Sequence, residues 1–286
     1  MFDINDICII GGDERQAYLG ALLAKDGKTV TYFALEKCGE AQPDYASLRF
    51  AVKGCDAVIL PMPLTKDGKT LYAPLSDIEI PLDEELAKSL SGKRVFCSYG
   101  EKLTATGDYK SAFVYDYLAR EELAVLNAVP TAEGALAAAI TSSGKTLHKS
   151  RCLVAGFGRI GKLLSRDLYA LGADVTVSAR KPEDLAMITA CGYTAVKTAA
   201  LEGSGKYDFI FNTIPSMIFG EKTLEKTAGG VVIDLASKPG GVDLEACKRL
   251  GINGFAALSL PGRTAPQTAA GIIKETICNI TREDDP

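Results

Sequence analysis

Short apolar runs alternate with helix-like segments along the whole chain. Apolar runs lie at 57–60, 95–97, 112–115, 152–155, 175–177, 194–196, 209–212 and 231–235, and a helix-like segment lies at 81–90. Strands that alternate with helices are typical of parallel sheets that carry helices on both faces. The pattern therefore predicts an α/β protein with open parallel sheets.

The stretch 151–181 has the pattern strand, glycine turn, helix, strand. Its turn holds Gly156, Gly158 and Gly161. In a dinucleotide-binding unit the first glycine makes the tight turn, the second lets a pyrophosphate approach the backbone, and the third lets the helix pack on the strand. The phosphates then lie at the helix N-terminus. The stretch predicts dinucleotide binding rather than a merely structural unit, and the expected contacts are Gly156, Phe157, Gly158, Arg159, Ile160 and Gly161.

The end of the second strand of this stretch indicates which dinucleotide is bound. An NAD site usually has an acidic residue there, which binds the ribose 2′-hydroxyl. Here the tip carries Ser178, Arg180 and Lys181, and the carboxylates of Glu183 and Asp184 come later. Two cations and a hydroxyl suit a 2′-phosphate. NADP is therefore expected, and NAD remains the alternative if the basic turn is only a solvated surface.

Two later loops add further cofactor candidates. One follows the run at 209–212 and the other follows the run at 231–235. Ligands of open α/β sheets bind outside the carboxyl ends of the strands. The expected contacts from these loops are Thr213, Ile214, Pro215 and Ala236.

Residues 6–35 repeat the order of strand, glycines, helix and strand. The third glycine is missing, because Gly11 and Gly12 are followed by Asp13, Glu14, Arg15 and Gln16. We interpret this segment as a second α/β unit that does not bind the cofactor. The chain then predicts two doubly wound Rossmann-like domains with a cleft between them, linked by interdomain helices.

The expected domain boundaries follow from these two units. They are an N-terminal substrate domain at 1–130, an interdomain helix and linker at 131–147, an NAD(P)-binding domain at 148–264 and a C-terminal helix at 265–286. Pro130 and Thr131 are expected to start the interdomain helix, with Thr131 as its N-cap. The C-terminal helix is expected to pack back on the N-terminal domain, because Ala269, Ile272, Ile273, Ile277 and Ile280 fall on one face.

Composition narrows the class of protein. The chain has 286 residues, a hydrophobic content of 47%, 32 basic and 36 acidic residues, and a net charge of −4. A balanced charge without a basic block disfavours nucleic acid. We expect no membrane span, since no apolar run approaches about 20 residues, and a cytoplasmic location, since no signal pattern opens the chain. The eight cysteines form no Cys-x-x-Cys pair and are expected to be reduced and buried, so no metal site is expected.

The single histidine is an obvious catalytic candidate, because two-domain hydroxyacid dehydrogenases use one. His148 precedes the first strand of the nucleotide domain and is expected at the N-terminal edge of that sheet. At about 3.3 Å per residue, it would lie on the order of 20 Å from the glycine turn. A histidine-dependent hydroxyacid dehydrogenase is therefore disfavoured, and so is a histidine-rich metal site.

The remaining candidates are cations, hydroxyls and residues at expected helix N-termini. Such groups fit an anionic substrate that carries carboxylates and faces the nicotinamide, although each one singly fits surface solvation or a structural cap equally well. The candidate substrate-binding residues are Asp13, Arg15, Gln16, Ser98, Thr131 and Arg263, and the candidate catalytic residues are Glu133 and Tyr99.

Four motifs together resemble those of dipicolinate synthase A subunits from spore-forming bacteria. They are Gly-Gly-Asp-x-Arg-Gln at 11–16, Pro-Thr-Ala-Glu-Gly at 130–134, Gly-Phe-Gly-Arg-Ile-Gly at 156–161 and Leu-Pro-Gly-Arg-Thr-Ala-Pro at 260–266. The resemblance covers almost the whole chain. It implies pyridine-nucleotide-dependent oxidation of a dihydrodipicolinate, derived from 4-hydroxy-tetrahydrodipicolinate of the lysine pathway, during sporulation. It also implies the flavoprotein-like B subunit of that enzyme as partner, and leaves a homo-oligomer open.

The resemblance gives the candidate residues provisional roles. Hydride would pass to C4 of NADP⁺, with Arg15, Ser98 and Thr131 among the carboxylate anchors. Glu133, or a water that it orients, would be the base. Two alternatives remain open at this point. One is another NADP-dependent two-domain oxidoreductase that acts on a small carboxylate, and the other is a non-catalytic module that senses NADPH.

Overall fold

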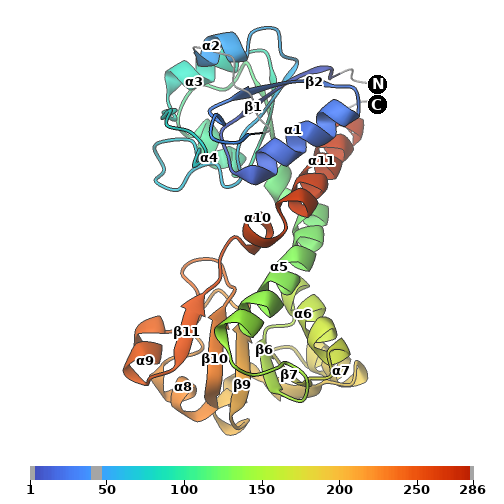
Figure 1. The fold of residues 1–286 in the computed structure, drawn as a ribbon, viewed down its shortest axis with the longest axis vertical. Helices are drawn as coiled ribbons and strands as arrows, with labels where there is room; N and C mark the ends of the chain where they lie inside the picture. The colour runs from blue at the N-terminus through green and yellow to red at the C-terminus, as the bar shows by residue number, and fades with distance from the viewer. Residues whose placement is uncertain (1–3, 40–46, 284–286) are drawn as a thin grey trace. The chain divides into compact units, whose positions relative to one another are not determined.

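The computed structural model describes residues 4–39 and 47–283. The chain divides into two compact units (Figure 1). The first unit holds the residues up to Asn127 together with those from Ala265 onward, and the second holds Ala128–Thr264. Each unit has a parallel sheet with a hydrophobic core on either face. The predicted α/β class with two doubly wound sheets is confirmed.

The sheet of the first unit has five strands in the order β2-β1-β3-β4-β5. Side chains alternate across each strand, so Cys8 faces one core and Ile9 faces the other. This alternation explains why the strands have few polar positions. The strands are β1 (Asp6–Ile10), β2 (Thr29–Phe33), β3 (Ala57–Ile59), β4 (Arg94–Cys97) and β5 (Phe113–Asp116).

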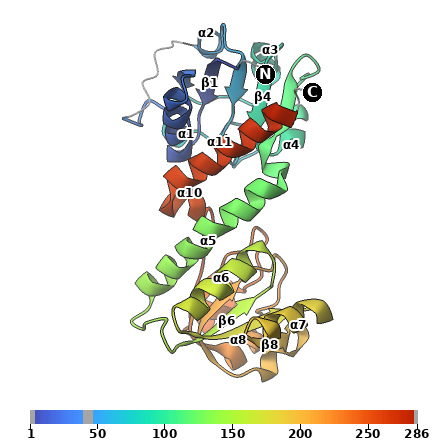
Figure 2. The ribbon, with the colours of Figure 1, turned by 90° about the vertical axis from the view of Figure 1, so that its right-hand side faces the viewer.

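Helices from both ends of the chain cover the first sheet. The helix α11 (Pro266–Glu283) packs beside α1 (Glu14–Lys25) (Figures 1 and 2). The apolar stripe of α11 is buried in the core of this unit. The other helical elements are α2 (Leu48–Ala51), α3 (Glu84–Ser89), α4 (Gly100–Thr104), η1 (Tyr117–Ala119) and the start of α5 (Glu121–Ser142).

The sheet of the second unit has six strands in the order β11-β10-β9-β6-β7-β8. Its first strand in the chain, β6, lies between β7 and β9, so the strand order reverses direction at β6 and β9. A ligand of such a sheet binds at this switch point, outside the carboxyl ends of the strands. The strands are β6 (Arg151–Ala155), β7 (Asp174–Ala179), β8 (Thr194–Lys197), β9 (Tyr207–Asn212), β10 (Ala228–Asp234) and β11 (Asn253–Ala256).

The helices of the second unit connect these strands and cover both faces of the sheet (Figures 1 and 2). Ala132, Ala135 and Ala139 from the second part of α5 are fully buried in one of its two cores. The remaining helical elements are α6 (Arg159–Ala170), α7 (Pro182–Ala190), η2 (Thr198–Gly203), α8 (Glu221–Thr227), α9 (Leu244–Arg249) and α10 (Leu260–Thr264).

The helix predicted to begin at Pro130 begins earlier. In the structure α5 starts at Glu121 and includes Pro130 in its interior. The expectation that Thr131 is an N-cap is therefore wrong. Proline cannot donate a backbone hydrogen bond and usually ends a helix, but here both parts of the helix are held by tertiary packing, through Leu123 on one side and Ala132 on the other.

Among the described helices, α5 is long and apolar enough to cross a membrane by length and composition alone. The sequence predicts no membrane span, because no apolar run approaches about 20 residues. Leu123 of this helix is buried in a core of the first unit, and Ala132 is buried in a core of the second. Both ends of this apolar helix thus contribute to cores of the protein.

Candidate functional site

The three glycines of the turn after β6 and the start of α6 are required for two different reasons. Gly156 has φ +100°, and its missing Cβ would lie 2.4 Å from Thr213 Oγ1. A Cβ on Gly161 would lie 2.1 Å from the carbonyl oxygen of Gly156. Both positions exclude any side chain because the protein itself fills the space. Gly158 is different, since nothing lies within 4 Å of its missing Cβ.

The open space at Gly158 fits a bound pyrophosphate. Gly158 is the N-cap of α6, with φ −83°, a value that any residue adopts. Neither conformation nor internal packing therefore requires glycine at this position. Close approach of a ligand to the backbone does require it, and a helix N-terminus favours an anionic one. The turn fits the phosphates of a dinucleotide.

A cavity of about 290 Å³ adjoins this turn. It lies where β6, β7, β8 and β9 end, which is the switch point of the sheet. Eight of its lining residues were predicted from the sequence: Gly156, Phe157, Gly158, Arg180, Lys181, Thr213, Ile214 and Pro215. Three others were not: Ala179, Asp184 and Thr198.

Thr198 and Asp184 change the expected chemistry of the cavity. Thr198 follows β8, and its hydroxyl lies 3.4 Å from Ser178 Oγ. Its position was not recognised because it depends on the pairing of β8 with β7. Asp184 lies in the first turn of α7 and lines the cavity together with Arg180 and Lys181. The cavity therefore contains one carboxylate in addition to two cations.

The other predicted cofactor residues lie outside the lining of this cavity. Ser178 is fully buried within β7, because that strand continues to Ala179. Arg159 is exposed in the first turn of α6, and Ile160 packs against a core of the unit. Gly161 packs on Gly156, and Ala236 is buried with its N–H donated to Asp234.

The corresponding turn in the first unit, at Gly11 and Gly12, differs because it lacks the open space and the unused backbone N–H group of Gly12 that a phosphate site would need. The backbone N–H of Gly12 donates to the carbonyl oxygen of Tyr72 at 2.8 Å. A Cβ on Gly11 would lie 3.1 Å from the same oxygen. The loop that contains Tyr72 therefore packs against the glycines, and a backbone donor that could bind a phosphate is already used within the protein.

Asp13, Arg15 and Gln16 form one cluster at the start of α1. Arg15 donates from Nε and Nη2 to the two carboxylate oxygens of Asp13, each at 2.8 Å, and also from Nη2 to the carbonyl oxygen of Met62. Arg15 is only 5% exposed. Burial opposes its charge, but the hydrogen bonds and ion pair with Asp13 outweigh burial and raise the pKa of Arg15.

The same cluster caps α1. Asp13 accepts from the Arg15 backbone N–H, and the Gln16 side chain accepts from the Asp13 backbone N–H, which is a capping box. The Nε2 atom of Gln16 is buried and has no hydrogen-bond partner among the described residues. These residues therefore have a structural role, and Gln16 retains an unused donor.

Ser98 and Tyr99 follow β4 and differ in their surroundings. Ser98 is fully buried and donates to the carbonyl oxygen of Pro61 at 2.9 Å. Tyr99 is exposed, has φ +58° and stacks beneath Lys102 Nζ, which lies 4.4 Å from the ring centre. A non-glycine residue in the left-handed region is strained, and such residues concentrate at functional sites. Of the two, Tyr99 is the more accessible.

The other three candidates belong to the second unit. Thr131 is half-buried and Glu133 is exposed, both within α5. Residues two positions apart on a helix do not face each other, so these two side chains do not share one face of α5. Arg263 lies in the last turn of α10 and lines a groove of about 330 Å³ with Gly134 and Thr141.

His148 lies where the sequence predicted. It is exposed, precedes β6 and has its Nδ1 atom 3.1 Å from the carbonyl oxygen of Leu171, at the end of α6. This is the N-terminal side of the sheet. The prediction that His148 lies away from the glycine turn is confirmed.

The cysteines of the strands are buried thiols. Cys8, Cys97 and Cys152 are buried, and none of the eight cysteines forms a disulfide. Cys191 is exposed, so the expectation that all eight are buried is wrong. Burial raises the pKa of Cys97 and of Cys152 to about 12, so both are protonated at neutral pH and are poor nucleophiles. Within residues 4–39 and 47–283, no group of three or more His, Cys, Asp or Glu side chains could hold a metal ion.

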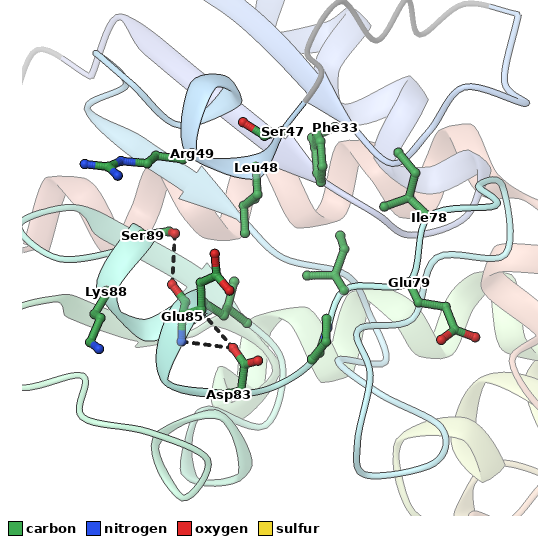
Figure 3. Close-up of a pocket in the computed structure, with 13 residues that line it drawn as sticks. Phe33, Ser47, Leu48, Arg49, Ile78, Glu79, Asp83, Glu85, Lys88 and Ser89 are labelled. Carbon is green, nitrogen blue, oxygen red and sulfur yellow. Dashed lines mark hydrogen bonds between the residues drawn. The ribbon is translucent and has the colours of Figure 1, made fainter.

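A cavity of about 660 Å³ lies in the first unit and contains none of the predicted site residues (Figure 3). Two of its polar side chains, Asp83 and Ser89, have structural partners. Asp83 accepts from the backbone N–H groups of Glu85 and Leu86, and Ser89 donates to the carbonyl oxygen of Glu85.

Comparisons with known proteins cover the whole chain. Residues 6–103 match the family model that describes the N-terminal domain of the dipicolinate synthase A subunit. The dipicolinate synthase A subunit of Bacillus subtilis (strain 168) is 30% identical over an alignment of 289 positions, which covers 97% of this chain and 96% of the relative.

Solved structures give the same result. The A chain of dipicolinate synthase from Bacillus subtilis has a TM-score of 0.85 and 29% identity, and covers 99% of this chain and 97% of that one. The A subunit from Bacillus halodurans has a TM-score of 0.85 and 27% identity, with 98% of each chain covered. A transhydrogenase from Sinorhizobium meliloti has a TM-score of 0.63 at 14% identity, covers 96% of this chain and 92% of that one, and shares the fold.

Proposed function

Because this chain belongs to the family of dipicolinate synthase A subunits, we propose that it is an NAD(P)-dependent oxidoreductase that makes dipicolinate. The proposed substrate is a dihydrodipicolinate derived from 4-hydroxy-tetrahydrodipicolinate, and the proposed cofactor is NADP. The proposed setting is the cytoplasm of a sporulating cell, with a flavoprotein-like B subunit as partner. The observation that carries the proposal is the open glycine turn beside a cavity lined by Arg180 and Lys181.

The second unit supplies the proposed dinucleotide site. Gly156–Gly161 would hold the phosphates, and Arg180 and Lys181 would bind the 2′-phosphate through charge-assisted hydrogen bonds. Bound there, the nicotinamide supplies a hydride acceptor. NAD is the second candidate, and the specific observation in its favour is Asp184, a carboxylate that could accept from a ribose hydroxyl.

The first unit supplies the proposed carboxylate anchor. Arg15 is buried, and its Nε and Nη2 atoms bond to Asp13 and Met62, so the Nη1 atom is the donor that remains for a substrate. Gln16 Nε2 is a second donor without a partner among the described residues. The guanidinium of Arg15 is positively charged and the amide of Gln16 is neutral, and both can donate a hydrogen bond to a carboxylate. Ser98 is a weaker candidate, because its proton is donated to Pro61.

Proton removal needs an accessible base. Glu133 is exposed on α5 and Tyr99 is exposed after β4, so both remain proposals for this role. Loss of a hydride and a proton from a dihydropyridine yields an aromatic ring, and this gain in stability drives the reaction. We propose that only one well-placed proton acceptor is therefore required.

One assay tests the proposed function. The chain would be coexpressed with a candidate B subunit and supplied with 4-hydroxy-tetrahydrodipicolinate and NADP⁺ or NAD⁺. Appearance of a product with the ultraviolet absorbance of a pyridine dicarboxylate supports the proposal. Turnover of a different small carboxylate instead would favour another two-domain oxidoreductase, and NADPH binding without turnover under any of these conditions would favour a sensor.

Arg180→Ala is expected to lower the preference for NADP over NAD by about tenfold or more, because a hydrogen bond to a charged group contributes roughly 1.5–3 kcal/mol. Dissociation constants for NADPH and NADH, measured by fluorescence titration, give the ratio. Arg166→Ala is the matched control, since Arg166 is exposed in the same unit and bonds to Asp167 rather than lining the cavity. An unchanged ratio in Arg180→Ala would reject the 2′-phosphate role.

Arg15→Lys is expected to raise the KM for the dicarboxylate by about tenfold while the dissociation constant for NADPH stays the same, because lysine keeps the charge but cannot form the fork that arginine does. Steady-state kinetics at saturating dinucleotide provide the measurement. Asp13→Asn is the companion variant, since it disturbs the Arg15 pair without removing the guanidinium. A KM that does not change in Arg15→Lys would leave Arg15 with its structural role alone.

A further inference from the structure

Two polar side chains that are not among the predicted site residues end neighbouring strands of the second unit. Asn212 ends β9 and Asp234 ends β10, and the two residues lie opposite each other in the register. Asn212 is fully buried and Asp234 is 4% exposed. Asn212 Nδ2 donates to Asp234 Oδ1 at 2.8 Å.

The carboxylate of Asp234 accepts from four N–H groups. Besides the Asn212 amide, the backbone N–H of Ala236 donates to Oδ1 at 3.2 Å, and those of Gly241 and Val242 donate to Oδ2 at 2.9 and 3.2 Å. An ionised carboxylate only accepts hydrogen bonds, so it suits all four of these donors. None of the ion pairs among the described residues includes Asp234, so hydrogen bonds from the loop after β10 stabilise this buried charge.

Asp234 determines which way the Asn212 amide points. Asn212 Nδ2 also donates to the carbonyl oxygen of Ile214 at 2.9 Å, and Asn212 Oδ1 accepts from the Ile214 N–H at 3.1 Å. With the amide reversed, its oxygen would face the Asp234 carboxylate and the Ile214 carbonyl, and its NH₂ would face the Ile214 N–H. Every one of these contacts would be repulsive. The observed orientation closes the chain at Ile214 into a tight turn.

That turn forms one wall of the proposed dinucleotide cavity. Thr213, Ile214 and Pro215 line it. Thr213 donates from its backbone N–H and its hydroxyl to the carbonyl oxygen of Ala155, at 2.9 and 2.8 Å, which places it against Gly156. Gly241 lies behind the turn, since its missing Cβ would be 2.4 Å from the carbonyl oxygen of Ile214. The two loops are thus connected through Asp234.

We propose that Asp234 is a positioning residue for the dinucleotide, which holds the Thr213–Pro215 wall against the glycine turn through Asn212. The inference rests on the proposed function, because it assumes that the cavity binds a dinucleotide. It assigns Asp234 no contact with substrate or cofactor. Asp234 determines the shape of this wall and does not affect the charge near the 2′-phosphate.

Asp234→Asn is the test. Whichever way the new amide turns, its NH₂ faces two N–H donors, so the network must rearrange. We expect the dissociation constants for NADPH and NADH, measured by fluorescence titration of the folded protein, to rise by about tenfold, equivalent to about 1.4 kcal/mol. Both should rise by the same factor, so that the preference between them is unchanged. Arg180→Ala is expected to change that preference instead.

Two control variants separate positioning from a general loss of stability. Val232→Ala shortens a side chain on the same strand that is buried in a core of the second unit. It is expected to lower the melting temperature but to change NADPH affinity by less than about twofold. Asp243→Asn makes the same chemical change at the N-cap of α9, where the carboxylate accepts from the Ala246 backbone N–H, and should also leave affinity unchanged.

A second variant covers the case in which Asp234→Asn does not fold. Asn212→Ala removes the amide but leaves Asp234 its three backbone donors, and it is expected to weaken NADPH and NADH binding to a similar degree. Wild-type affinity in whichever of these two variants folds would overturn the inference, and so would an equal loss of affinity in Val232→Ala. Failure of the wild-type protein to bind either dinucleotide would instead overturn the proposed function, and the inference with it.

Discussion

Replacing Gly158 by alanine is expected to leave the protein folded and to weaken its binding of NADPH by about tenfold or more. Nothing lies within 4 Å of the missing Cβ, and φ is −83°, so the methyl group meets neither a steric nor a conformational obstacle within the protein. The space that it fills is the one a pyrophosphate would occupy at the N-terminus of α6. Fluorescence titration and thermal unfolding of the same preparation would measure both effects.

Gly220→Ala is the matched control for this substitution. Gly220 is also the N-cap of a helix in the second unit, has φ −74°, and has no atom within 4 Å of its missing Cβ, but it does not line the cavity. The cost of the methyl group to the helix cap should therefore be similar in both variants. Equal NADPH affinity in Gly158→Ala, Gly220→Ala and the wild type would contradict phosphate binding at the glycine turn.

Ile273→Ala is expected to destabilise the first unit by about 2–5 kcal/mol, the usual cost of truncating a buried isoleucine. Ile273 is fully buried and belongs to the core that also contains Leu19 and Leu23 of α1. The expected effect is large because α11 contributes several buried residues to that core. Denaturant unfolding, followed by hydrogen exchange of the amides in β1, would measure the change in the unit concerned.

A surface residue of the same helix provides the comparison for Ile273. Thr268 is exposed on α11, and Thr268→Ala is expected to change the free energy of unfolding by less than about 0.5 kcal/mol. NADPH affinity should be the same in both variants, because neither residue belongs to the second unit. If Ile273→Ala costs no more than Thr268→Ala, α11 does not contribute to the core as the structure indicates.

The glycine turn could be predicted from the sequence because its requirements are local. Gly161 packs on the backbone of Gly156 within the same βα segment, and Gly156 has a positive φ. The spacing of the motif records both of these requirements. Thr198 was missed because it reaches the cavity only through the pairing of β8 with β7. Such pairing joins distant parts of the chain and leaves no local pattern.

Other features were predicted wrongly because a single residue type does not determine where a helix or strand ends. Pro130 suggested a helix start, but packing on both sides of it extends α5 through the proline. Ser178 was expected at a strand tip, but β7 continues beyond the apolar run and buries it. The residue type of Arg15 suggested a cation for a carboxylate. Its paired hydrogen bonds to Asp13 depend on side-chain geometry, which spacing in the sequence does not specify.

The place of α11 in the first unit has a consequence for synthesis of the protein. A chain leaves the ribosome from its N-terminus, and domains tend to fold as they emerge. The second unit is continuous in sequence, from Ala128 to Thr264, whereas the first unit includes residues from Ala265 onward. The segment that is translated first must therefore wait, with part of one core incomplete, until α11 has been made. The unit proposed to bind the dinucleotide can mature before the unit proposed to bind the substrate.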